Sequence, residues 1–415
     1  MNHLFDPLVH HPLKTLVKAL CVALIVTGCG GGGTSGSATK TSFASGPITG
    51  LGSIYVNGVR YDDSSAKVSS EDDDSDLTLK PGMFVEVEAS GSSSDGSGRS
   101  GTASEIRFGS EIVGPVGAVA DIKFDATNGT GSFTLLGQTV KFSVATTSFD
   151  NSLPSGHNSI TSGTVIEVHG IFNPADGNYT ATRIEAESSA THFKLRGAIS
   201  DLDVPPDTFK IGTELISYAA LKPLSLTLSN DQVVRVKLDP TKVDGQWVAT
   251  KIKSGVRKMS DHDEAEVKGL LAITTVSGNP DTYTYKVGDA SFVLGTGVTF
   301  PTGAIHGAYV EVEGRVVGGV FTASKIELED ESSSGYGEFE FKDKIASLAK
   351  VPNSSDAAKF TVKGMTIRVD ATTEFTPTAT RANIADTACV EVKAVHITGS
   401  NELLATLIKF DDSCR

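Results

Sequence analysis

The fold is decided by a pair of segments, Val310-Glu311-Val312-Glu313-Gly314 and Thr322-Ala323-Ser324-Lys325-Ile326. Each alternates apolar with polar residues, the period-two pattern of a β-strand that buries one face. The same pair recurs four more times at similar spacing, which identifies an internal repeat. The first segment recurs at 85–88, 166–170, 234–237 and 390–393, and the second at 102–106, 180–184, 248–252 and 404–408.

A hairpin precedes each pair of strands. In the first repeat it is Ile54-Tyr55-Val56, the turn Asn57-Gly58, and Val59-Arg60-Tyr61. Asn-Gly favours a type I′ turn because both residues tolerate positive φ. Its counterparts lie at 133–142, 209–218, 283–292 and 360–369, and the third of the five hairpins is the most diverged. A further strand opens each unit, near Ile48, Val116, Ile199, Leu270 and Phe341.

These patterns predict an all-β chain with about five strands in each unit of about 70 residues. We expect a tandem array of about five small antiparallel β-barrels, OB-like or SH3-like, because closure removes exposed strand edges. A short sandwich is the alternative. The predicted segments are a signal peptide at 1–28, a flexible tether at 29–44, and repeats at 45–112, 113–190, 191–258, 259–332 and 333–415.

The N-terminus predicts export. Lys14 and Lys18 precede an uncharged apolar run at 19–27, which is far shorter than the ~20 residues of a membrane-spanning helix and suits a signal peptide. The run ends in Val26-Thr27-Gly28-Cys29, which resembles the lipobox of bacterial lipoproteins. The resemblance implies cleavage before Cys29, acylation of that cysteine and, because Gly30 follows rather than Asp, sorting to the outer membrane. A chance Gly-Cys after a simple secretion signal is the alternative.

Charge argues against a nucleic-acid partner. The formal net charge is −14, and removal of residues 1–28, with two Lys and one Asp, makes it −15. A strongly acidic protein repels phosphate backbones. We therefore expect a membrane contact through the lipid anchor and an envelope protein, a glycan or a cell-wall component as partner, on the periplasmic or cell-surface side.

Two cysteines remain after export and lipidation. Cys21 leaves with the signal peptide and Cys29 carries lipid, so Cys389 and Cys414 are left. An exported protein with one remaining pair is expected to oxidise it. Cys389 is predicted at the start of the fourth strand of the last unit and Cys414 just beyond its final strand, on neighbouring strands.

The repeat also resembles a known family. The residues that carry the likeness are Gly52 to Tyr61, Leu79-Lys80-Pro81-Gly82-Met83-Phe84-Val85-Glu86-Val87, and the Thr-Ala-Ser-x-Ile strand. They resemble domain-of-unknown-function family 5666, whose members occur in tandem in exported bacterial proteins. The first repeat matches best, and the second, fourth and fifth match in outline. The resemblance implies no activity, because the family has none assigned.

Candidate chemistry is sparse. A glutamate recurs on the outward face of one strand in four repeats, at Glu86, Glu167, Glu311 and Glu391, and Arg235 replaces it in the third, a pattern that favours a structural role over paired-carboxylate catalysis. Glu167 with Arg183 and Glu311 with Lys325 are predicted cross-strand ion pairs. The acidic runs 71–76 and 261–264 lack calcium-loop spacing and are interpreted as solvated loops. Other interpretations are a packing role for Trp247, surface positions for His169, His306 and His396, and a mobile loop at 90–101.

No catalytic, cofactor or metal site is therefore predicted, and three classes of function stay open. The first is a non-enzymatic envelope lipoprotein whose repeats bind a ligand or act as a scaffold. The second is a spacer or adhesive scaffold with no small ligand. The third is a hydrolase-like or cation-binding site between repeats, with Asp261, His262 and Asp263 as candidates.

Overall fold

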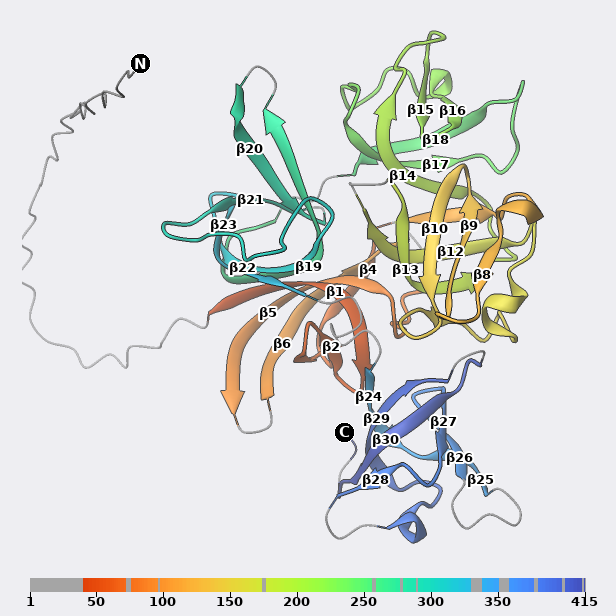
Figure 1. The fold of residues 1–415 in the computed structure, drawn as a ribbon, viewed down its shortest axis with the longest axis vertical. Coiled ribbons are helices and arrows are strands. Elements are labelled where there is room, and N and C mark those ends of the chain that lie inside the picture. The colour runs from red at the N-terminus through yellow and green to blue at the C-terminus, as the bar shows by residue number, and fades with distance from the viewer. Residues whose placement is uncertain are drawn as a thin grey trace, which may run out of the picture. The chain divides into compact units, whose positions relative to one another are not determined.

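The computed structural model describes residues 40–71, 76–95, 98–173, 177–255, 259–276, 279–288, 290–329, 338–350, 358–376, 380–397, 400–412 and 414. Cys29, the predicted signal peptide and most of the predicted tether lie outside the described residues. The described chain is all-β and contains the predicted succession of small barrels (Figure 1). Among the described residues, no helix is long and apolar enough to cross a membrane.

Repeat 1 defines the barrel type. Its strands are β1 (Thr41–Leu51), β2 (Ile54–Val56), β3 (Val59–Asp62), β4 (Lys67–Ser70), β5 (Phe84–Asp95) and β6 (Gly98–Phe108). Strand β1 runs antiparallel to both β2 and β5, β2 pairs with β3, and β5 pairs with β6. Strand β3 closes the barrel by running parallel to β6. The strands therefore follow the order β1-β2-β3-β6-β5, and the β1–β5 pair closes the ring. This is the Greek-key order of an OB-like barrel, whereas a simple up-and-down barrel would contain only antiparallel pairs.

The other four repeats share this order. Repeat 2 comprises β7 (Ile112–Pro115), β8 (Lys123–Asp125), β9 (Thr130–Leu135), β10 (Gln138–Ser143), β11 (Ser148–Phe149), β12 (Val165–Phe172) and β13 (Tyr179–Ala186). Repeat 3 comprises β14 (Phe193–Ser200), β15 (Thr208–Ile211), β16 (Glu214–Ser217), β17 (Val233–Leu238) and β18 (Trp247–Ser254). Repeat 4 comprises β19 (His262–Val276), β20 (Asn279–Val287), β21 (Ala290–Leu294), β22 (Tyr309–Val317) and β23 (Val320–Leu328).

Repeat 5 comprises β24 (Glu338–Lys344), β25 (Ala346–Lys350), β26 (Ala358–Val362), β27 (Met365–Val369), β28 (Glu374–Phe375), β29 (Cys389–His396) and β30 (Leu403–Phe410). The parallel closure recurs as β10 with β13, β16 with β18, β21 with β23, and β27 with β30. The third repeat keeps the same strand order although its sequence is the most diverged. Single turns of 3₁₀ helix lie at Val119–Asp121, Gly156–Ser159, Ala219–Leu221 and Arg381–Asn383.

Alternation along the strands builds one apolar core per barrel, except that repeats 2 and 3 share a continuous core. Tyr179, Trp247 and Phe321 occupy equivalent buried positions on the last strands of repeats 2, 3 and 4. Trp247 is therefore a packing residue, as the sequence predicted.

Strand β1 joins repeats that are far apart in the sequence. It pairs in parallel with β19 of repeat 4 and, at Gly50 and Leu51, with β24 of repeat 5. It begins at Thr41, inside the segment 29–44 that the sequence assigned to a tether. The Ser/Thr-rich residues at 41–45 form a strand because β5 and β19 supply hydrogen-bonding partners on both edges.

Two hairpins extend beyond their barrels, β5–β6 and β19–β20 (Figure 1). The first corrects the prediction of a mobile loop at 90–101, because Ser90 pairs with Thr102 and Ser94 with Arg99. Composition alone favoured a loop, but two adjacent antiparallel segments satisfy each other's backbone groups.

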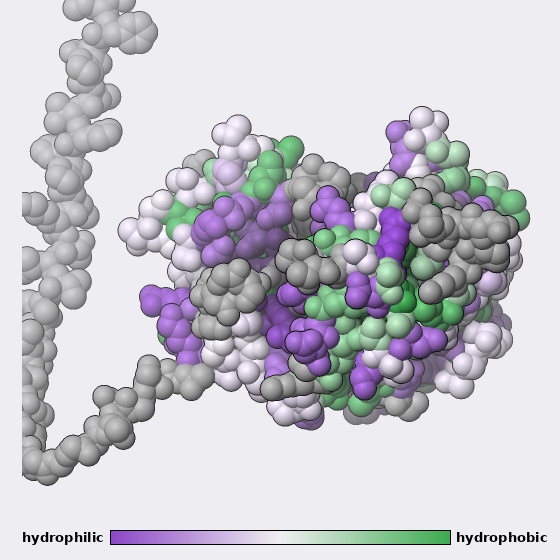
Figure 2. Space-filling model, turned by 90° about the horizontal axis from the view of Figure 1, so that it is seen from below, coloured by the Kyte–Doolittle hydropathy of each residue, from purple (hydrophilic) through white to green (hydrophobic). Residues whose placement is uncertain are grey.

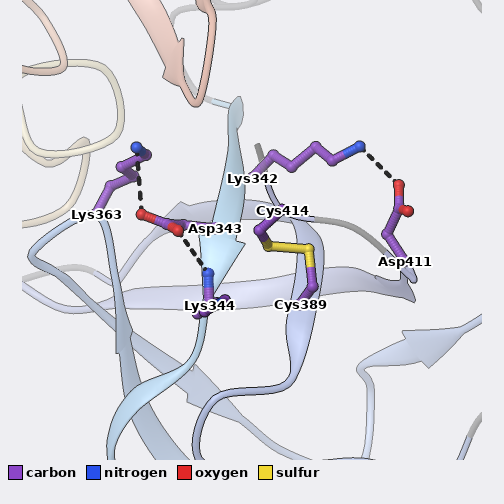
Figure 3. The surroundings of a disulfide bond; sticks show 7 residues. All are labelled: Lys342, Asp343, Lys344, Lys363, Cys389, Asp411 and Cys414. Atoms are coloured by element: carbon purple, nitrogen blue, oxygen red, sulfur yellow. Dashed lines mark hydrogen bonds and ion pairs between the residues drawn. A yellow bond between two sulfur atoms is a disulfide. The ribbon is translucent and has the colours of Figure 1, made fainter.

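A disulfide joins Cys389 and Cys414, whose Cα atoms lie 5.5 Å apart (Figure 3). Cys389 opens β29, and Cys414 follows β30, which pairs with β29. An ion pair from Lys342 Nζ to Asp411 Oδ2, at 2.6 Å, lies beside the bridge. The bridge thus links the final residues to the last barrel.

The predicted cross-strand pairs are wrong by two residues. Glu311 faces Glu327, whereas Glu313 faces Lys325, and Glu167 faces Glu185. In repeat 4 a two-residue turn and a bulge between Glu313 and Gly314 set this register. The prediction counted residues along the sequence and therefore did not allow for the extra residue of the bulge.

The outward-facing charges are largely covered by neighbouring repeats. Glu86, Glu111, Lys194, Arg196, Glu266, Lys268 and Glu311 are buried although none belongs to an apolar core. Arg196 of repeat 3 pairs with Glu111, just before repeat 2, at 2.7 Å. Lys268 pairs with Glu311 at 2.6 Å. Buried charges need such partners because desolvation of an isolated ion is costly. The repeats therefore contact each other partly through charged faces, beside apolar contacts such as the buried cluster of Ile171, Leu270 and Tyr309.

The surface carries both hydrophilic and hydrophobic side chains. The face in Figure 2 mixes hydrophilic residues with smaller groups of hydrophobic ones. Large exposed apolar side chains concentrate in repeat 4, where they are Tyr283, Val293, Ile305, Val317, Val320 and Leu328.

Candidate ligand-binding cleft

A cleft of about 830 Å³ lies between repeats 1 and 4. Repeat 1 contributes its first, third and last main strands through Ser42, Phe43, Val59, Tyr61, Arg99, Ser100 and Gly101. Repeat 4 contributes β19, the loop after β21, and the β22–β23 hairpin through residues 263–266, 295, 296, 298, 313–315 and 322–324. Its volume lies in the range of small-molecule binding sites.

Strand pairing fixes the floor of the cleft. Ser42 pairs with Glu264 and Ala44 with Glu266 in the parallel β1–β19 contact. Gly314 allows the wall to pack tightly, since a Cβ there would lie 2.1 Å from the carbonyl oxygen of Thr322. The cleft therefore rests on regular strands rather than on loops alone.

Carboxylates outnumber cations along the walls. Asp263, Glu264, Glu266 and Glu313 line the cleft, against Arg99 and Arg315. Arg99 pairs with Glu266 at 2.8 Å, and Lys40 pairs with Glu264 at 2.9 Å. Glu266 and Glu313 lie directly opposite each other on β19 and β22. Like charges in opposed positions destabilise a sheet, and the ion pairs of Glu266 with Arg99 and of Glu313 with Lys325 offset that repulsion here.

Glu266 is the most unusual side chain in the cleft. It is only 5% exposed, and its Oε1 accepts no hydrogen bond from the described residues. Burial and the nearby charge of Glu311 raise the pKa of Glu266 to about 7, although Arg99 opposes the shift. The group can therefore exchange a proton near neutral pH.

Aromatic rings do not offer a stacking platform here. Phe43 and Tyr61 line the cleft but are buried, and burial raises the pKa of the Tyr61 hydroxyl. The accessible wall combines charged groups and hydroxyls with aliphatic side chains such as Val298.

Of the predicted candidates 261–263, only Asp263 lines the cleft. Its Oδ2 accepts hydrogen bonds from the backbone and hydroxyl of Thr41, which lower its pKa. Asp261 accepts a bond from the Gly319 amide, and His262 is buried within 3.0 Å of the Ser260 hydroxyl. These three side chains have separate structural partners and do not converge as a catalytic group.

The predicted surface position of His169 is corrected, because this side chain is buried, whereas His396 is half-buried and His306 is exposed. Burial lowers the pKa of His396 to about 4. His169 lies 3.8 Å from Glu185 and 3.9 Å from Glu167. His396 ends β29 and His306 precedes β22, as predicted, whereas His169 lies within β12.

Within the described part of the chain, two groups of side chains have metal-like spacing, Glu167-His169-Glu185 and Glu311-Glu313-Glu327. Protein cations already pair with both. Lys80 and Arg183 pair with Glu185, and Lys268 and Lys325 pair with carboxylates of the second group. A bound metal would have to displace these cations, so the residues fit ion-pair networks better. Of the acidic run 71–76, residues 72–75 lie outside the described residues, while Glu71 pairs with Arg235.

Sequence reasoning missed Arg99, Glu266 and Arg315. Arg99 lies in a Ser/Gly-rich stretch, and Glu266 has the pattern of a solvated strand position. A usable signal was the occurrence of Glu on both the first and fourth strands of repeat 4, which are neighbours in this barrel.

Comparison with known families and proteins accounts for the barrels. The model of the family described as domain of unknown function (DUF5666) matches residues 45–107, 114–185, 283–327 and 353–409, more than half of the chain. No curated protein matches the chain. The match omits repeat 3, whose strand order is nevertheless the same. The chain therefore belongs to the DUF5666 family and carries its domain in tandem.

Proposed function

We propose that this protein is a non-enzymatic, lipid-anchored protein of the bacterial cell envelope that binds a ligand in the cleft between repeats 1 and 4. The cleft is the observation that carries the proposal, because it combines volume, a strand-built floor and a buried carboxylate. Pockets with a few convergent polar groups are the usual sites of small-ligand binding.

The envelope address rests on the N-terminal sequence. A signal-like segment, a Gly-Cys junction and a Gly/Ser-rich tether at 30–40 suit a barrel body held near a membrane by acyl chains. Replacement of Cys29 by Ser tests it: we expect the variant to lose its acyl chains by mass spectrometry and to leave the membrane fraction. A variant that stays in that fraction without acyl chains would contradict lipid anchoring.

A scaffold role is the second candidate. Strand β1 pairs with strands of repeats 4 and 5, and buried ion pairs join other repeats, so the array has built-in connections. A pure spacer, however, requires no cleft lined by opposed carboxylates. We therefore favour binding.

A cleft-blocking variant tests the binding role. Thr296 is exposed and lines the cleft, whereas Thr299 is exposed in the same loop and does not line it. The full chain is screened by thermal shift against calcium, glycans, cell-wall fragments, polyamines and polyanions. A ligand at a hundredfold its Kd adds about 2.7 kcal/mol. We expect Thr296→Trp to remove the shift and Thr299→Trp to retain it. A shift that both variants retain, or no shift in the whole screen, would contradict the cleft.

A further inference from the structure

Resting on the proposed lipid anchoring, we propose that the tip of the β22–β23 hairpin docks onto the surface of the lipid bilayer, with Val317 and Val320 as its apolar contact. The hairpin tip adds a second, protein-borne contact to the acyl chains. It thereby fixes which end of the protein faces the membrane.

The hairpin tip exposes apolar side chains. Val317 is 62% exposed and Val320 is 49% exposed, and the two residues pair across the turn Gly318-Gly319. On the neighbouring strand β21, Val293 is 48% exposed and pairs with Thr322, two residues beyond Val320. Because residues two apart on a strand share a face, the three valines form one apolar patch on the outer side of repeat 4.

The tip lies close to the first residue of β1. Strands β1, β19 and β22 lie side by side, with β19 in the middle (Figure 1). Just before β19, Asp261 accepts a hydrogen bond of 3.0 Å from the Gly319 amide in the tip. On the opposite side, Asp263 accepts one of 3.0 Å from the Thr41 amide. Because neighbouring strands are about 4.8 Å apart, the tip lies about 10 Å from the start of β1.

The sequence keeps the predicted lipid within reach of this end. Only residues 30–40 separate Cys29 from Thr41. Even fully extended, a segment of this length spans at most about 40 Å. Acyl chains on Cys29 therefore hold the hairpin tip near the bilayer. A second contact made by the same anchored molecule benefits from a high effective concentration, so a small patch is sufficient.

The charges near the tip define the kind of bilayer. Asp261 and Asp263 stay ionised, because hydrogen bonds from backbone amides lower their pKa values. Their charges disfavour a strongly anionic surface, so the partner is a surface rich in zwitterionic phospholipid. Arg315 is exposed and lies two residues before Val317 on the same face, where its guanidinium can contact lipid phosphate groups.

A second copy of the chain is the competing occupant of the patch. Three half-exposed valines offer on the order of 200 Å² of apolar surface, whereas each partner of a stable protein interface buries about 800 Å². A bilayer accepts a small protruding patch without a complementary protein surface. The size of the patch and its position beside the predicted anchor therefore favour the bilayer.

The test places the full acylated chain in vesicles of phosphatidylethanolamine and phosphatidylcholine that contain a nitroxide-labelled lipid. Val320→Cys carries a bimane fluorophore, which the nitroxide quenches on contact with the bilayer. The matched control is Val243→Cys, because Val243 of repeat 3 has a similar exposure of 57%. We expect quenching about threefold or more stronger at position 320 than at position 243, since only the first position contacts lipid.

A charge introduced into the patch tests its apolar character. In the labelled Val320→Cys chain, Val317→Asp should reduce quenching about twofold or more, because a carboxylate resists transfer from water to an apolar environment. Val243→Asp in the same labelled chain is the control and should leave quenching unchanged.

The outcomes separate this inference from the lipid anchor. If the acylated chain floats with the vesicles but positions 320 and 243 are quenched equally, or Val317→Asp has no effect, the hairpin contact is wrong and the anchor stands. Disulfide-linked dimers of unlabelled Val320→Cys, without quenching of the labelled chain, would assign the patch to a second copy. A chain that carries no acyl group and does not float with the vesicles would overturn both proposals.

Discussion

At the scale of single residues, buried ion pairs form part of the contacts between the barrels. Glu111 is 3% exposed and its partner Arg196 is 5% exposed, so each neutralises a charge that water cannot reach. Glu266 is less well satisfied, because its Oε1 accepts no hydrogen bond from the described residues. Their sequence patterns are those of solvated strand faces, which is why sequence analysis found neither. Alternation identifies the face opposite the core but not what covers it.

Glu111→Gln should lower the free energy of unfolding by about 3–5 kcal/mol, because it leaves the Arg196 charge buried without its counter-ion. Urea denaturation measures the loss. Glu391→Gln removes a more exposed carboxylate and should cost less than about 1 kcal/mol. Equal effects of the two substitutions would show that Glu111 is accessible to water in solution.

The raised pKa of Glu266 gives a signed pH dependence. Its carboxyl holds a proton up to about pH 7 in the folded chain but only to about 4.5, its ordinary value, when unfolded. The folded state binds more protons in this window, so its contribution to stability falls as pH rises from about 4.5 to 7. Glu266→Gln should remove that fall, as measured by thermal unfolding across the window. An unchanged pH profile in the variant would contradict the buried, proton-binding carboxyl.

At the scale of elements, the hairpins and barrels were predictable because their patterns are local. The hairpin at 54–61, the counterpart hairpins and the fourth and fifth strands all follow from period-two alternation and turn residues. The extension of β1 to Thr41 and of β5 to Asp95 was not predictable, because the Ser/Gly-rich composition of these segments is typical of loops and the strands depend on distant partners.

The contact of β1 with repeat 5 depends on the absence of a side chain at Gly50. A Cβ there would lie 2.3 Å from the carbonyl oxygen of Glu340. Gly50→Ala should therefore separate β24 from β1 and speed amide exchange at residues 340 and 341, as hydrogen-exchange mass spectrometry reports. Ser65→Ala, at an exposed turn residue of repeat 1, is the control and should leave that exchange unchanged. Faster exchange in both variants would indicate a general loss of stability instead.

The disulfide of repeat 5 closes a loop of 25 residues. Loop closure of this length stabilises a domain by about 3 kcal/mol in the chain-entropy model. The double variant Cys389→Ser with Cys414→Ser should lower the free energy of unfolding of repeat 5 by that amount, as measured by urea denaturation. The free energy of unfolding of the core shared by repeats 2 and 3 should stay unchanged. An unchanged transition for repeat 5 would contradict the assigned stabilisation.

At the scale of the whole molecule, a sequential array would let each repeat contact only its chain neighbours. Here β1 pairs with strands of the fourth and fifth repeats, and Glu71 of the first repeat pairs with Arg235 of the third. The count and type of repeats were predictable from the sequence, but contacts between distant repeats and the cleft they form were not. Such contacts arise from outward faces whose polar patterns are the same whether they face water or another barrel.

The parallel contact between β1 and β19 forms the floor of the cleft, so a crosslink across it tests the account most directly. Ser42 and Glu264 are paired positions on these strands, at a spacing that a disulfide can bridge. In a chain carrying Ser42→Cys and Glu264→Cys, we predict an intramolecular bond between the two introduced thiols, detected by peptide mass. Ser42→Cys with Glu327→Cys is the control and should give none. Absence of the first bond in a folded chain, or equal formation of both, would contradict the joined repeats and the cleft between them.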